Sequence, residues 1–69
     1  MVLQVSTGNP KLELLRLNCA LLSKRHGLPK AMITRLPGGF QVHPPPGADL
    51  KEWAEMLRQG FGNVTLAPQ

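Results

Sequence analysis

The stretch AMITRLPGGFQVHPPP, residues 31–46, decides the fold. Residues 31–36 are rich in strand formers, and residues 40–43 alternate apolar and polar side chains, as a strand with one buried face does. Between them, Pro37 and Gly38 suit the two central positions of a type II turn, the second of which needs a positive φ. The prolines end the second strand, because proline has no N–H to donate to a sheet. The stretch predicts a β-hairpin followed by a stiff connection.

A strand and a helix are predicted on the N-terminal side of this hairpin. Residues 2–5 are apolar and partly β-branched, which favours a short strand. Asn9 is a preferred helix N-cap, and Pro10 suits the first helical position because its missing N–H would be unpaired there in any case. The helix is expected to continue to His26 and to stop at Gly27, with basic side chains in its last turn.

A second helix and a last strand are predicted on the C-terminal side. Asp49 is a good N-cap, and Glu52 stands three residues later, as in a capping box. The helix is expected over residues 50–59, closed by Gly60, with the strand at 63–67. The chain of 69 residues is therefore interpreted as one α+β domain with the order β-α-β-β-α-β, an antiparallel-rich sheet, a central hairpin and two helices. This order resembles that of ferredoxin-like domains, which include RNA-recognition modules.

The two predicted helices differ in how far their apolar residues spread. In the second helix they occupy an arc of roughly 100°, an ordinary core stripe: Leu50, Trp53, Ala54, Leu57 and Phe61. In the first helix two stripes lie side by side and together sweep roughly 220°, interrupted by Asn18. One stripe consists of Leu12, Leu15, Cys19 and Leu22, and the other of Leu14, Leu17 and Leu21.

One face of a small sheet does not cover so wide an arc, so a second element or a second molecule must do it. In one hypothesis the first helix lies between the sheet and the second helix, as internal core. In the favoured hypothesis the chain forms a homodimer through this helix, because contiguous exposed apolar surface usually marks an interface. A lone asparagine in such an interface fixes its register. The predicted interface residues are Leu14, Leu17, Asn18, Leu21 and Leu22.

The charge of the chain supports an alternative function. The net charge is +4 and the sequence pI is about 10.0, a balance that also occurs in nucleic-acid-binding proteins. Basic side chains bind phosphates, and aromatic or imidazole rings stack on bases. The candidate residues for DNA or RNA binding are Lys24, Arg25, Lys30, Arg35, Phe40 and His43.

The sequence offers no catalytic or metal-binding constellation. Gly38 and Gly39 lie between strands, without the Lys-Ser/Thr that follows a phosphate-binding loop. One cysteine and two histidines lack ligand spacing. We therefore expect no cofactor, no metal and no enzymatic activity. A lone cysteine fits a reducing compartment, and no signal peptide or membrane span is predicted, so the expected location is the cytoplasm. The predicted function is that of a small regulatory, adaptor or inhibitor protein that binds other proteins.

Overall fold

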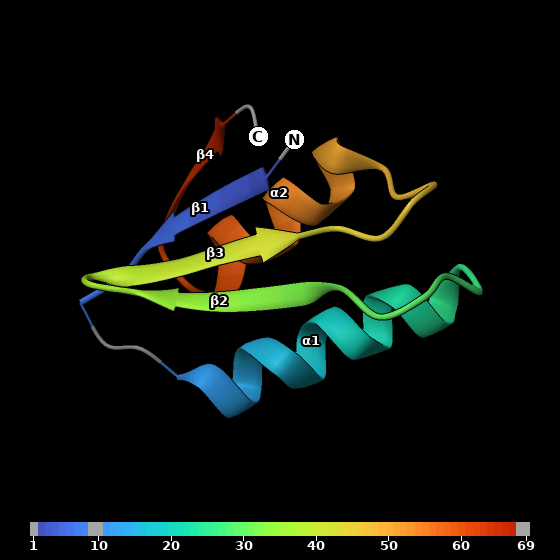
Figure 1. Ribbon diagram of the computed structural model, residues 1–69, viewed down its shortest axis with the longest axis horizontal. Helices are drawn as coiled ribbons and strands as arrows, with labels where there is room; N and C mark the ends of the chain where they lie inside the picture. The colour runs from blue at the N-terminus through green and yellow to red at the C-terminus, as the bar shows by residue number, and fades with distance from the viewer. Residues whose placement is uncertain (1, 9–10, 68–69) are drawn as a thin grey trace.

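The computed structural model describes residues 2–8 and 11–67. Its elements are β1 (Val2–Ser6), α1 (Leu12–Arg25), β2 (Met32–Leu36), β3 (Gly39–His43), α2 (Leu50–Gly60) and β4 (Asn63–Ala67). The predicted α+β class and the order of the elements are confirmed. The strands form one antiparallel sheet in the order β2-β3-β1-β4 (Figure 1). The strands that α1 joins, β1 and β2, are therefore separated by β3, as in a split β-α-β arrangement.

The sheet has one apolar face, which both helices cover. Leu3 of β1 lies opposite Val42 of β3, and Val5 lies opposite Phe40, so these four side chains share a face and are buried. The helices complete this core with side chains from α1 and α2: Leu15, Cys19, Leu22, Trp53, Ala54 and Leu57. The other face carries an uncharged polar row that crosses all four strands: Thr34, Gln41, Gln4 and Thr65.

The C-terminal end of α1 confirms the predicted glycine stop. Gly27 has a φ of 65° and its N–H donates to the Lys24 carbonyl. The next N–H, that of Leu28, donates to the Ser23 carbonyl at 2.8 Å. This pair of bonds is a Schellman motif, which satisfies the last carbonyls of a helix and requires a left-handed residue that glycine adopts without strain.

The N-terminal end of α1 is later than expected. The predicted N-cap, Asn9, and the predicted first helical residue, Pro10, lie outside the described residues. Lys11 has a φ of −115° and a ψ of 76°, which are not helical values, and the described helix begins at Leu12.

The start of α2 confirms the predicted cap but not the reciprocal half of a capping box. A side-chain oxygen of Asp49 accepts from the N–H groups of Lys51 and Glu52. The Glu52 carboxylate does not return to the N–H of Asp49. Its Oε1 lies 2.8 Å from Nε2 of His26, so it ties the first turn of α2 to the end of α1. The predicted hairpin turn is also confirmed, with a φ of 79° at Gly38.

Candidate functional site

The two leucine stripes of α1 have different environments. The stripe that includes Leu15 and Cys19 is buried in the core. On the other stripe, Leu14 is 44% exposed, while Leu17 and Leu21 are each 55% exposed. The hypothesis that α1 is wholly internal is therefore wrong. We call Leu14, Leu17 and Leu21 the leucine surface.

Leu22 does not belong to the leucine surface, although it was predicted as an interface residue. Its side chain is buried in the core cluster. The difference follows from helical geometry, because Leu22 follows Leu15 by seven residues and so lies on the same side of the helix. Leu21 is one residue earlier, about 100° away, and faces outward.

A groove between α1 and α2 borders the leucine surface. Leu21 and Arg25 line it from α1, and Glu55 and Met56 line it from α2. Asn18 also lines this groove, and its Nδ2 donates to the carbonyl of Leu14 at 2.8 Å. The predicted interface residue Asn18 is thus held against its own helix beside the exposed leucines. The groove thus combines apolar side chains with charges of both signs.

The predicted basic residues are all exposed, but they do not form one patch. Lys30 precedes β2 and Arg35 lies near its end, about 17 Å away at the rise of an extended chain. Arg25 lines the groove whose opposite wall carries Glu52 and Glu55. Acidic side chains there reduce the positive potential that a phosphate would meet.

The predicted stacking platform does not form. Phe40 is only 1% exposed and belongs to the core cluster, so its ring is closed to a nucleotide base, and that prediction was wrong. His43 is half-buried at the end of the same strand. Since the two residues are three positions apart in a strand, their side chains lie on opposite faces of the sheet.

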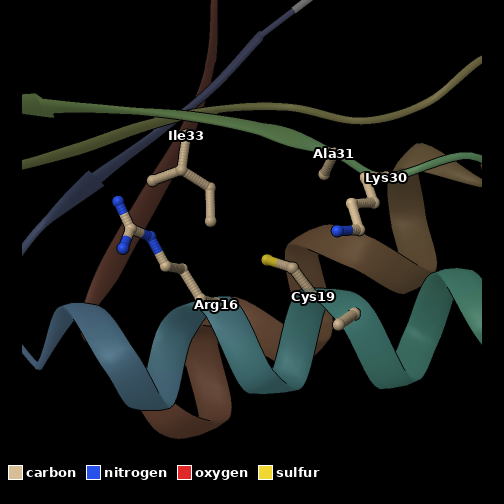
Figure 2. Close-up of a pocket in the computed structure, with 6 residues that line it drawn as sticks. Arg16, Cys19, Lys30, Ala31 and Ile33 are labelled. Atoms are coloured by element: carbon tan, nitrogen blue, oxygen red, sulfur yellow. The ribbon is translucent and has the colours of Figure 1, made fainter.

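A second groove, between α1 and β2, brings together residues that the sequence did not link. It has a volume of about 330 Å³, and its lining residues are Arg16, Cys19, Ala20, Lys30, Ala31 and Ile33. Figure 2 shows Arg16 and Cys19 rising from α1 toward Ile33 and Ala31 on the strand side, with the amine of Lys30 above the helix. We call this the β2 groove. Arg16 had no distinguishing signal in the sequence beyond its place on the polar side of the first helix.

The buried Cys19 thiol is protonated at neutral pH. Burial in apolar surroundings raises its pKa from 9.0 to about 11, because desolvation disfavours the thiolate. A thiolate is the reactive form of cysteine, so this thiol is a poor nucleophile. Its position in the core and its raised pKa fit a structural role in the apolar stripe.

The stability of the protein is expected to fall in alkaline solution because of Cys19. A folded-state pKa above the unfolded value stabilises the fold fully below pH 9.0, and that stability is lost as pH rises through about 11. The loss amounts to about 2–3 kcal/mol when complete. Urea unfolding gives the free energy of unfolding of the wild type and of Cys19→Ala at each pH in this range. The loss due to Cys19 is the difference between the two proteins in the slope of this free energy against pH. Equal slopes would contradict the assignment.

Within residues 2–8 and 11–67, no group of three or more His, Cys, Asp or Glu side chains is placed to hold a metal ion. No helix in that part of the chain is long and apolar enough to cross a membrane. Comparison with known protein families, with curated proteins and with solved structures finds no match for this chain.

Proposed function

We propose that this protein is a non-enzymatic interaction module, a small regulator, adaptor or inhibitor, which self-associates through the leucine surface of α1. The observation that carries this proposal is that three leucines on one helix remain about half exposed beside a groove lined by both apolar and charged side chains. Burying them removes apolar area from water, at about 25 cal/mol per Å². A domain this small has a limited core of its own and gains stability from such a contact.

The spacing of the leucine surface suits a second copy of the same helix. Leu14, Leu17 and Leu21 are separated by three and four residues, which is the spacing of an apolar seam between paired helices. A two-fold axis makes such a surface self-complementary, because the same patch serves on both copies.

The dipole of α1 favours an antiparallel pairing. Glu13 lies in the first turn, and Lys24 and Arg25 lie in the last turn. In an antiparallel dimer Glu13 of each helix lies near Lys24 and Arg25 of its partner, while Lys11 and Arg16 stand at the same end as Glu13. The two helix dipoles then also oppose each other favourably. In this proposal Asn18, near the middle of the helix, specifies the register of the pairing.

A glutamate in the leucine surface is expected to give a folded monomer. Leu17→Glu and Leu21→Glu place a charge in the proposed apolar contact, whereas the charge remains in water when the chain is monomeric. Light scattering after size-exclusion chromatography should show a dimer for the wild type and a monomer for both variants, with unchanged circular dichroism.

Two control variants separate this effect from a general effect of added charge. Ala20→Glu introduces the same charge at an exposed position of α1 outside the leucine surface, and it should remain dimeric. Leu22→Glu should unfold the chain, because Leu22 is buried in the core. A wild-type chain that stays monomeric at every concentration would overturn the proposal.

The same experiment addresses the nucleic-acid alternative. A mixture of DNA and RNA is added at low and at high salt, since phosphate contacts weaken steeply as salt rises. A complex that forms at low salt, and that Lys24→Glu with Arg25→Glu abolishes, would favour nucleic-acid binding. The proposed interaction module predicts a mass that is independent of added nucleic acid.

A further inference from the structure

The outer edge of β2 is an unpaired sheet edge. β2 pairs with β3 on one side, and no strand among the described residues pairs with its other side. Alternate residues of Met32–Leu36 therefore direct N–H and carbonyl groups outward. Such an edge is a template on which an extended segment of another chain forms main-chain hydrogen bonds.

Three positive charges follow this edge on the helix-covered side of the sheet. Lys30 and Arg16 line the β2 groove, and no carboxylate is among the residues that line it. Arg35 pairs in register with Phe40, whose side chain is in the core. The Arg35 side chain therefore also leaves the strand on the helix-covered face of the sheet. Figure 2 shows the guanidinium of Arg16 below Ile33, between the backbone of β2 and the helix. The charges thus form a line along the strand.

On the face of the sheet that the helices do not cover, the same edge carries two exposed apolar side chains with Thr34 between them. Met32 is 72% exposed and Leu36 is 37% exposed, and both lie on the face opposite Ile33, since strand side chains alternate. A strand added beside β2 would direct one set of side chains toward Arg16, Lys30 and Arg35. Its alternate set would lie next to Met32 and Leu36, where cross-strand apolar pairs are stabilising.

A second copy of the chain does not fit this edge. Antiparallel pairing of two β2 strands would bring the three cations of each copy close to those of the other, and like charges across a strand pair are destabilising. Nucleic acid fits poorly as well, because single-strand binding depends on exposed aromatic rings, and Phe40, Trp53 and Phe61 all belong to the core or pack against it. The other sheet edge, β4, carries no charged residue among Asn63–Ala67.

We infer that the β2 edge and the β2 groove bind an extended segment of a partner protein by strand addition, and that this segment alternates acidic and aliphatic residues. The carboxylates lie toward Arg16, Lys30 and Arg35, and the aliphatic side chains lie beside Met32 and Leu36. This surface is on the β2 side of α1 and is independent of the leucine surface. A dimer formed through the leucine surface would therefore still bind a partner protein at each β2 edge.

The probe that tests this inference is a capped synthetic peptide of alternating glutamate and valine, titrated into the isotope-labelled full chain and followed by NMR. Amide shifts are expected at β2 and at Lys30 and Ala31, together with slower hydrogen exchange of outward β2 amides. A peptide of alternating lysine and valine should not bind. An acidic peptide with N-methyl groups on alternate amides keeps its charge but cannot donate main-chain hydrogen bonds to β2. It should bind at least about tenfold more weakly.

Charge-reversed variants locate the site. Arg16→Glu with Lys30→Glu should weaken binding of the glutamate-valine peptide by at least about tenfold. Lys51→Glu with Arg58→Glu makes the same change in net charge at exposed positions of α2 and should leave binding unchanged. Leu17→Glu should bind as the wild type does, which separates this site from the proposed dimer.

Three results would overturn the inference. The first is equal binding of the N-methylated peptide, which would show that charge alone is recognised. The second is equal loss in both charge-reversed pairs, which would show that net charge and not the β2 groove is responsible. The third is displacement of the peptide by an equal concentration of single-stranded oligouridylate, which would assign the edge to nucleic acid.

Discussion

Replacing Gly39 by alanine is expected to lower the free energy of unfolding by more than about 4 kcal/mol. Gly39 lies in β3, and a Cβ added there would collide with the carbonyl oxygen of Val5 and lie 2.9 Å from the carbonyl carbon. Its third neighbour is the Cα of Ser6 at 3.2 Å. All three atoms belong to the backbone of β1, so the clash is relieved only by separating the two central strands of the sheet.

The expected size of this effect exceeds that of most single substitutions. A domain of this length has a free energy of unfolding of about 3–10 kcal/mol. Losing part of the β1–β3 pairing, with the core side chains Val5 and Phe40 that it aligns, is expected to cost more than about 4 kcal/mol. Urea unfolding followed by far-ultraviolet circular dichroism measures the difference from the wild type.

Gly60→Ala is the matched control, because it makes the same chemical change in open space. No heavy atom lies within 4 Å of a Cβ at Gly60, the last residue of α2. Alanine has the higher helix propensity, so stability should be unchanged or rise by up to about 1 kcal/mol. Gly39→Ala should therefore lower the free energy of unfolding, whereas Gly60→Ala should leave it unchanged or raise it. A Gly39→Ala protein as stable as the wild type would show that β1 and β3 do not pair in the described register.

Trp53→Ala is expected to cost about 3–5 kcal/mol of stability. Trp53 is fully buried and has the largest side chain among the fully buried residues described. It lies in the cluster that joins α2 to α1 and the sheet. Removing the indole leaves a cavity that strands and helices on several sides cannot all close. The same denaturant experiment measures the loss by circular dichroism, because the chain has no second tryptophan for fluorescence.

Trp53→Phe separates the loss of volume from the loss of the indole N–H. The buried Nε1 of Trp53 has no hydrogen-bond partner among the described residues. Leaving such a donor unpaired costs about 1–3 kcal/mol, which the phenylalanine variant recovers while it keeps most of the apolar area. Its stability loss should therefore be less than half that of Trp53→Ala. Equal losses in the two variants would contradict this expectation.

Much of the fold follows from local features that are visible in the sequence. The turn at Gly38, the helix stop at Gly27 and the cap at Asp49 were predicted because each depends on the backbone or side-chain chemistry of a few adjacent residues. The two stripes of the first helix were also visible, because 3.6 residues per turn places them side by side. The element order follows from these signals together.

The environment of each stripe was decided only by the tertiary structure. The stripes of α1 are alike in composition, and it is the packing of α1 on the sheet that buries Leu15 and leaves Leu17 half exposed. Phe40 alternates with Val42, which indicated a shared face, but its burial depends on the helices that cover that face. Arg16 and Lys30 line one groove only because α1 lies beside β2. Dihedral preference and periodicity act between neighbours in the chain, whereas burial and electrostatic grouping depend on residues that only folding brings together.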